Sequence, residues 1–257
     1  MGSLSSNASS WLNPATIHVL VVVFVATLVR SAIGFGEALV AVPLLALSLR
    51  LEIAAPLAVL VSITIALVVV AQDWRKIHLR SMGWLMAATV LGIPLGLLLL
   101  TSSHQRLTKA TLGLVIVAFS VYSLIGERPP ELKADSMPWL LGCGFVAGIM
   151  GGAYGMNGPP LAVYGSMRRW SAQHFRATLQ GYFLPASVLG MAGYWMKGLW
   201  TPAVTHYYLL SLLAVVPAIP LGRVLNHRMR GETFLKYVYA GLVVVGGLLL
   251  VQAIGRS

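Results

Sequence analysis

Charged residues are scarce in this sequence: they make up 10% of its 257 residues, against 58% for hydrophobic residues. A soluble domain carries roughly a quarter charged residues, and so low a share would leave large apolar patches in contact with water. The scarcity therefore excludes an ordinary soluble protein. A single cysteine, Cys143, also excludes an internal disulfide framework and a cysteine-based metal cluster.

Acidic residues are rarer still, at 7 against 18 lysines and arginines, which gives a net charge of +11. A nucleic-acid-binding protein gathers its basic residues on one face, whereas here they lie in short clusters between apolar runs. The positive-inside rule for membrane proteins produces this placement. We therefore expect a lipid bilayer as a partner and no nucleic acid.

Catalytic motifs are also missing. The sequence has no GxSxG, HExxH or GxxxxGK[ST] motif, and its 6 histidines lack metal-ligand spacing. We therefore expect a protein that is not an enzyme, does not use ATP, and holds neither a metal nor a cofactor.

Long apolar runs fill most of the chain. A transmembrane helix needs about 20 mostly apolar residues, so these runs predict an all-α integral membrane protein. The runs that qualify are 14–29, 53–72, 81–101, 107–125, 202–222 and 233–254.

A charged, proline-containing segment, residues 126–136, divides the chain near its middle and is predicted to be a linker. A polar N-terminal tail (1–13) and a first half (14–125) precede it, and a second half (137–257) follows. We expect the two halves to form one transmembrane domain, because they resemble each other in sequence.

Two pairs of segments carry this internal resemblance. IGFGEALVAVPLL (33–45) matches YGMNGPPLAVYGS (154–166) at an offset of 121, and GIPLG (92–96) matches AIPLG (218–222) at an offset of 126. Two matches in the same order predict a duplication, which is common in secondary transporters.

Each half is predicted to hold about five helical elements, which gives about 8–10 transmembrane or half-spanning helices in all. An odd number of crossings in each half places the halves in opposite orientations, as inverted repeats. Segments 35–49 and 157–169 are short for a full crossing, so tilted, broken and re-entrant forms all stay open. The other elements are 14–31, 53–73, 81–101, 107–125, 137–153, 174–196, 202–223 and 233–254.

The distribution of basic residues predicts the sidedness. With the N-terminus outside, twelve lysines and arginines fall on the inner side and five on the outer side, leaving out Arg30 within an apolar run. This bias predicts that both termini lie outside. We expect a multi-pass protein of the plasma membrane, of the bacterial inner-membrane type.

Glycines interrupt two apolar stretches that would otherwise be helical, at Gly34 and Gly36 and again at Gly155 and Gly158. Broken helices persist in a membrane only where protein or a water-lined cavity satisfies their backbone groups. Breaks at corresponding places in two halves indicate a transporter's binding site. Their helix N-termini suit an anion.

A second set of glycines, Gly144, Gly148 and Gly152, has four-residue spacing. Such a seam of small residues brings helices together. It can join helices within one chain or between two chains, so a monomer and a homodimer both stay open.

The interrupted segments also carry a family resemblance. SAIGFGEALVAVPLL, GAYGMNGPPLAVY and FRATLQGYF resemble signatures of the TauE/SafE family, the toluene sulfonate uptake permeases. The resemblance covers about residues 17–254 and implies a transporter of small anions, chiefly sulfite and sulfonates. Glu37 stands where the family commonly has a small or aromatic residue, and Asn157 stands where it usually has glycine.

Two charges fall inside apolar stretches, Arg30 and Glu37. Ionisable residues within a membrane are functional candidates by default. Arg30 can attract the anion or extend toward the inner surface. Glu37 is the candidate for coupling to protons or sodium, because a carboxylate facing an anion must be protonated or paired. A structural ion pair that holds the break is the alternative for both.

Polar and aromatic residues near the breaks complete the predicted binding site. Asn157 can donate and accept hydrogen bonds, Gln180 can reach the centre, and Ser62 can contact a ligand or its own helix. Phe35 and Tyr154 flank the breaks and can close the site. The substrate-binding candidates are Arg30, Gly34, Phe35, Gly36, Glu37, Ser62, Tyr154, Gly155, Asn157, Gly158 and Gln180.

These observations favour a secondary transporter or facilitator of a small anion, sulfite or an organosulfonate, with export favoured and alternating access between the repeats. Three alternatives stay open: an anion channel, a transporter of another carboxylate or sulfur oxyanion, and a non-transporting scaffold subunit.

Overall fold

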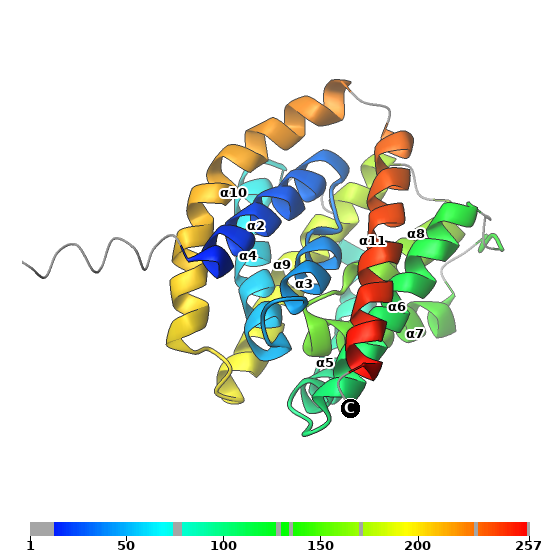
Figure 1. Cartoon of the computed structure of the whole chain (residues 1–257). Helices are drawn as coiled ribbons and strands as arrows, with labels where there is room; N and C mark the ends of the chain where they lie inside the picture. The colour runs from blue at the N-terminus through cyan, green and yellow to red at the C-terminus, as the bar shows by residue number, and fades with distance from the viewer. Residues whose placement is uncertain are drawn as a thin grey trace, which may run out of the picture.

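A computed structural model of the chain describes residues 13–73, 79–126, 130–133, 136–169, 172–228 and 231–255. These residues form ten helices and no strand (Figure 1). Seven of the helices are long and apolar enough to cross a membrane. The predicted all-α integral membrane protein is therefore confirmed. The helices are α2 (Pro14–Ile33), α3 (Glu37–Ala46), α4 (Leu51–Asp73), α5 (Leu79–Leu100), α6 (Gln105–Ile125), α7 (Met137–Tyr154), α8 (Gly158–Met167), α9 (Ala172–Met196), α10 (Pro202–Arg228) and α11 (Gly231–Ile254).

The two predicted helix breaks occur at the glycines. α2 ends at Gly34, which has a φ of 97°, and α7 ends at Gly155, which has a φ of 66°. Glycine adopts this left-handed conformation without the steric penalty of a side chain. Gly36 repeats it with a φ of 95° directly before α3. Each break therefore ends one helix and lets the chain turn into a short one.

The short helices α3 and α8 have 10 residues each. Ten residues of α-helix are about 15 Å long, half the thickness of the hydrocarbon core. His18 Nε2, in the first half of α2, lies 3.1 Å from the carbonyl oxygen of Leu44 near the end of α3. α3 therefore runs back along α2 as a re-entrant half-helix. For segment 35–49 the structure therefore shows a break followed by a short helix that turns back along α2.

α8 also ends close to an earlier part of the chain. The backbone N–H of Leu132, in the predicted linker, donates to the carbonyl of Met167 at 2.9 Å. Arg168 donates in turn to the carbonyl of Leu132 at 2.6 Å. Since Leu132 precedes α7, the end of α8 has returned to the region where α7 begins.

The glycine seam packs α7 against α5 within one chain. A Cβ added to Gly144 would lie 2.7 Å from the Leu85 carbonyl, and one added to Gly148 would lie 2.9 Å from the Gly92 Cα. Contacts this short leave room only for hydrogen at these positions. The seam therefore joins the two halves, and Gly92 of the GIPLG motif belongs to it. Gly222 of the AIPLG motif packs as closely on α2, with a hypothetical Cβ 2.7 Å from the Leu28 carbonyl.

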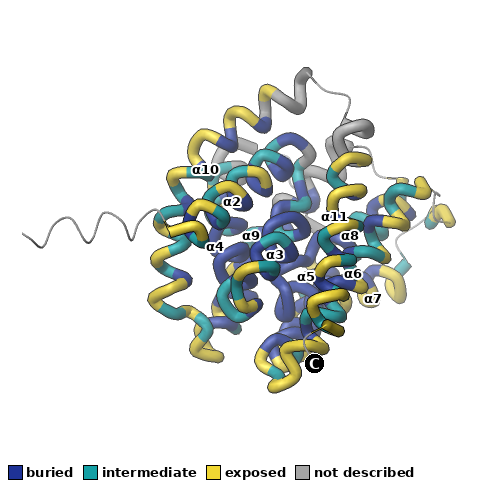
Figure 2. The backbone as a smooth tube through the Cα atoms, in the orientation of Figure 1, coloured by how far each residue is buried: buried dark blue, intermediate teal, exposed yellow. Residues whose placement is uncertain are grey.

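The outer helices expose apolar side chains, as lipid contact requires. The exposed fraction reaches 72% for Leu213 and 71% for Val216 on α10, and 70% for Leu91 on α5. In Figure 2, α10 and α11 alternate between buried and exposed positions, while α3 and α4 at the centre are largely buried. The helix breaks lie in this enclosed interior, and residues 150–159, which include the second break, are all buried.

Candidate functional site

The two helix breaks meet at one small cavity. Residues at the N-terminal ends of α3 and α8 line it together with residues of α2, α4 and α9. Its volume is about 20 Å³, which is room for about one water molecule. A Cβ added to Gly158 would lie 3.5 Å from the Phe35 ring, so residues of the two breaks are in close proximity. The site is closed in this conformation.

A buried ion pair spans the first break. Arg30 Nη1 donates to Glu37 Oε2 at 2.5 Å and to Ser62 Oγ at 2.7 Å. The side chains of Arg30 and Glu37 are only 4% and 1% exposed. The alternative in which Arg30 extends toward the inner surface is therefore wrong. Its guanidinium stays in the interior because a carboxylate and a hydroxyl accept its hydrogens there.

The Phe183 ring lies against the same guanidinium. The central carbon of the Arg30 guanidinium is 5.2 Å from the ring centroid, within the range of a cation–π interaction. Arg30 therefore contacts α3 and α4 through hydrogen bonds and α9 through an aromatic ring. This packing holds the positive charge at one place in the cavity wall.

The second break contributes an amide. Asn157 precedes α8, yet its side chain makes no capping hydrogen bond to that helix. It packs instead against Gly151, where an added Cβ would lie 2.5 Å from Nδ2. Asn157 also interacts with Tyr182, whose hydroxyl is 2.6 Å from Thr89 Oγ1. The amide is thus buried and held from α7 and α9 rather than used for helix capping.

The two half-helices offer different numbers of backbone donors. The first four N–H groups of a helix have no partner within it, and α3 begins Glu37, Ala38, Leu39 with all three amides present. α8 begins Gly158, Pro159, Pro160, so prolines remove two of the corresponding donors. The N-terminus of α3 is therefore the better anion-binding end, and it is the one next to Arg30.

Seven of the predicted site residues line the cavity together, and three others, Gly34, Phe35 and Tyr154, lie outside its lining. Gly34 ends α2, and Phe35 packs near Gly158. Tyr154 points toward α6, where its hydroxyl lies 2.5 Å from Thr111 Oγ1 and donates to the Thr108 carbonyl at 3.1 Å. The side chain of Gln180 lies outside the described residues. The seven that line the cavity are Arg30, Gly36, Glu37, Ser62, Gly155, Asn157 and Gly158.

Two lining residues of α9 were missed by the sequence analysis, Phe183 and Ser187. The internal repeat carries a signal for the first of them. Phe183 stands 183 − 62 = 121 positions after Ser62, which is the offset of the interrupted segments. Ser62 and Phe183 both contact Arg30. Ser187 has no such signal, because its counterpart at this offset, Ala66, is an ordinary apolar residue.

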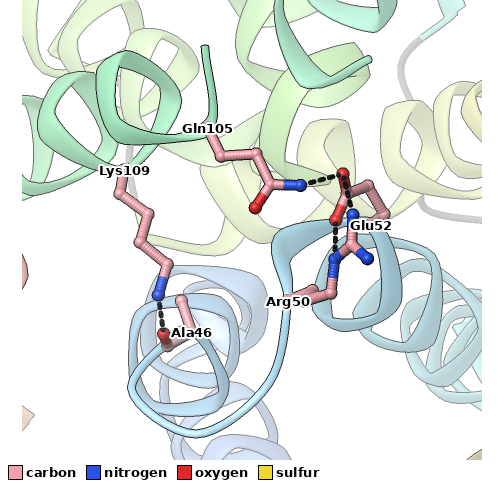
Figure 3. Close-up of polar contacts among 5 residues, drawn as sticks. All are labelled: Ala46, Arg50, Glu52, Gln105 and Lys109. Carbon is pink, nitrogen blue, oxygen red and sulfur yellow. Dashed lines mark hydrogen bonds and ion pairs between the residues drawn. The ribbon is translucent and has the colours of Figure 1, made fainter. Parts of the chain in front are cut away.

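Polar contacts also close the corner between α3 and α4 (Figure 3). Lys109 Nζ of α6 donates to the carbonyl of Ala46, the last residue of α3, at 3.0 Å. Gln105 Nε2 donates to Glu52 at 2.9 Å, and Glu52 pairs with Arg50 at 3.1 Å. We call these five residues the α6 clamp, because they fasten the far end of the half-helix to the start of α6.

The site combines one fixed cation, one carboxylate, one amide and a helix N-terminus in a water-sized space. The cation, the amide and the helix N-terminus are groups that bind oxyanions in proteins, whereas the carboxylate opposes an anion unless it is protonated or paired. A family model described as "Sulfite exporter TauE/SafE" matches residues 19–250 of the chain. No match was found among curated proteins or among solved structures.

Proposed function

Since the chain belongs to the TauE/SafE sulfite exporter family, whose members are membrane transporters, we propose that it carries sulfite or an organosulfonate across the membrane. The protein acts as a secondary transporter or facilitator, and the substrate binds where the two helix breaks meet. One observation carries the proposal: Arg30 is buried beside the N-terminus of a half-helix in the middle of the molecule. A buried guanidinium in a membrane protein is costly unless it has a role.

Recognition of the anion uses three kinds of donor. The guanidinium of Arg30 supplies charge and directed N–H groups, which match the oxygens of a sulfonate. The first amides of α3 add backbone donors and the positive end of the helix dipole. The Asn157 amide approaches from the second break and completes the site from the opposite half.

Transport requires the cavity to open, because a sulfonate group is several times larger than the water-sized space present. We propose that the two halves are inverted repeats that move against each other. In order along the chain, α2 to α6 of the first half correspond to α7 to α11 of the second. Corresponding helices make corresponding contacts: α5 packs on α7 as α10 packs on α2, while α4 packs on its own counterpart α9 and α6 on its counterpart α11. Motion of one repeat against the other exposes the fixed site first to one side and then to the other.

The proposed sidedness follows from the basic residues. The α6 clamp, with Arg50 and Lys109, lies at the end that faces outside, together with both termini. The inner end carries twelve of the seventeen basic residues counted by side. An anion that crosses alone is driven outward by a negative-inside potential, by about 2.3 kcal/mol per charge per 100 mV. Export is therefore the favoured direction for uncoupled movement through the plasma membrane.

Purified protein in liposomes tests the function. We expect saturable sulfite flux that methanesulfonate inhibits and that Asn157→Ala weakens, while Asn13→Ala, outside the cavity, leaves it unchanged. Flux that does not saturate would instead favour an anion channel. No flux of sulfite or sulfonates from folded protein would contradict the proposal and favour a different substrate or a scaffold role.

A further inference from the structure

The cavity contains a single pair of charges. Among the described residues that line it, only Arg30 and Glu37 are ionisable. Their counterparts at the repeat offset of 121 are Gly151 (30 + 121) and Gly158 (37 + 121). The second half therefore adds neither a cation nor a carboxylate to the site, and the charge of the cavity is decided by these two side chains.

Other ionisable groups near α3 lie at its opposite end. The helices packed on α3 are α2, α4, α6 and α11. Besides Arg30, α2 contributes His18 at Leu44, and α6 contributes Lys109 at Ala46. Leu44 and Ala46 lie about 10 and 14 Å along the helix axis from the first residue of α3. From α4, the group facing the Arg30–Glu37 pair is the Ser62 hydroxyl.

On α11 the described residues Lys236 and Tyr237 are exposed, which leaves Tyr239 as the ionisable group to place. It is buried and packs edge-on against Phe119 of α6, with ring centroids 5.9 Å apart. It is not among the residues that line the cavity. Among the described residues that line the cavity, Arg30 is therefore the one ionisable partner of Glu37, and the neutral Ser62 hydroxyl is its other polar neighbour.

Glu37 already occupies the place that a substrate anion needs. Its Oε2 takes one hydrogen of Arg30 Nη1, and Ser62 Oγ takes another. Its second oxygen, Oε1, is buried and has no hydrogen-bond partner in the described part of the chain. An incoming anion that binds Arg30 brings a second negative charge to a cation already paired with a carboxylate, and an uncompensated charge is unfavourable in this interior.

From this geometry, and resting on the proposed function, we infer that the protein carries a monovalent anion together with one proton. In the empty site Arg30 is positive and Glu37 negative. In the loaded site Arg30 pairs with the anion, and the proton that entered with it resides on the Glu37 carboxyl group. Both forms of the site have zero net charge, so the transport cycle moves no net charge across the membrane.

The same balance determines the substrate class. A monoanion such as hydrogensulfite or an alkylsulfonate neutralises Arg30 once Glu37 is protonated. A dianion such as sulfate would leave one uncompensated negative charge in a buried site, because no second cation lines the described cavity. The site therefore selects monoanions.

Proton coupling also changes what drives transport. An electroneutral cycle does not respond to the membrane potential, and its direction follows the combined gradients of anion and proton. The protein exports when the inside-to-outside concentration ratio of the anion exceeds the outside-to-inside concentration ratio of protons. It imports when the outside is acidic and the internal anion concentration is low.

Liposomes containing the full chain and an entrapped pH dye provide the decisive measurement. The probe is methanesulfonate, because its charge stays at −1 at every working pH, and methanedisulfonate is the dianionic control. We expect methanesulfonate influx to acidify the lumen with one proton per anion and to be unaffected by an imposed potassium diffusion potential. Methanedisulfonate influx should be at least tenfold slower. The wild-type ratio of protons to anions decides the question without any variant.

Replacing the carboxyl group adds a second readout. In Glu37→Gln the empty site keeps one positive charge, so each transport cycle moves net charge across the membrane. We therefore expect methanesulfonate flux that follows the imposed potential and does not acidify the liposome lumen. The matched control is Glu131→Gln, a carboxylate that is 60% exposed outside the cavity, which should keep one proton per anion.

The outcomes separate the two proposals. Wild-type flux of methanesulfonate that follows the potential and carries no protons would overturn the coupling inference while leaving the transport function intact. Equal flux of the dianion would overturn the charge selectivity. Absence of flux for both sulfite and methanesulfonate would remove the transport function, and the inference with it.

Discussion

Arg30 and Glu37 lie on either side of a helix break and meet with Nη1 and Oε2 2.5 Å apart. In an unbroken helix the side chains of residues seven apart are two turns, or about 10.5 Å, from each other along the axis. The turn at Gly34 and Gly36 replaces that separation with direct contact. The break therefore allows a buried ion pair to form at the N-terminus of a half-helix.

Removing only one partner of this pair should destabilise the protein strongly. We expect Arg30→Met to lower the free energy of unfolding by about 3–5 kcal/mol, because Glu37 is left as an unpaired buried charge. The double variant Arg30→Met/Glu37→Met should recover much of that loss. Thermal unfolding in detergent measures both. Neither variant should transport, and additive destabilisation would show that the two side chains are not coupled.

The fit of Asn157 against Gly151 should control substrate affinity. Gly151→Ala places a Cβ 2.5 Å from the Asn157 Nδ2, so the amide must leave its position. We expect the half-saturation concentration for sulfite to rise roughly tenfold or more, since a hydrogen bond to a charged group contributes about 1.5–3 kcal/mol. The measurement is a flux titration in liposomes.

The matched control lies on the same helix. Gly142 has nothing within 4 Å of its hypothetical Cβ, so Gly142→Ala should transport like the wild type. Equal affinity in the two variants would show that the position of Asn157 does not matter for binding.

The seam between α5 and α7 should tolerate no added methyl group. A Cβ on Gly96 would lie 2.8 Å from the Gly152 Cα, whereas one on Gly83, on the same helix, meets nothing within 4 Å. Gly96→Ala should lower stability by about 1–3 kcal/mol through overpacking, and Gly83→Ala should not. Unfolding temperatures compared in one detergent decide this, and a similar change in both variants would argue against a tight seam.

Opening of the site should expose Ser187. This residue lines the cavity and is only 6% exposed in the closed conformation. In a Cys143→Ala background, we expect Ser187→Cys to react slowly with a membrane-impermeant thiol reagent, and at least several-fold faster during sulfite transport.

Ser211 provides the reference for this labelling experiment. It is 0% exposed and does not line the cavity, so Ser211→Cys should stay unreactive in both conditions. A Ser187→Cys protein whose labelling rate is the same with and without substrate would contradict alternating access through this cavity.

Much of the architecture follows from local sequence. The expected helices agree with the observed ones to within a few residues, because apolar runs and glycine interruptions act on the nearest turn of the chain. α2 was expected to span 14–31 and spans Pro14–Ile33, and α7 was expected to span 137–153 and spans Met137–Tyr154. The glycine seam was also predicted from spacing alone, although its partner helix was not.

The candidate site was less accessible to sequence analysis. Arg30 and Glu37 were selected because charges in an apolar run are rare, but their pairing across the break depends on the direction taken after Gly36. Tyr154 was selected because it adjoins a break, yet its hydroxyl contacts α6. Ser187 was missed, because a serine in a helix has no distinctive pattern until a neighbouring helix places it beside the cavity.

The sequence by itself determined that this chain is a membrane protein, where its helices begin and end, and which of its charges lie within the membrane. Composition and local steric preferences are sufficient for those properties, because each acts within about 20 residues of chain. Only the tertiary structure decided that α3 turns back along α2, and that Arg30 meets Glu37, Ser62 and Phe183 at one point. Those contacts join residues up to 183 − 30 = 153 positions apart, and they exist only when four helices are packed together.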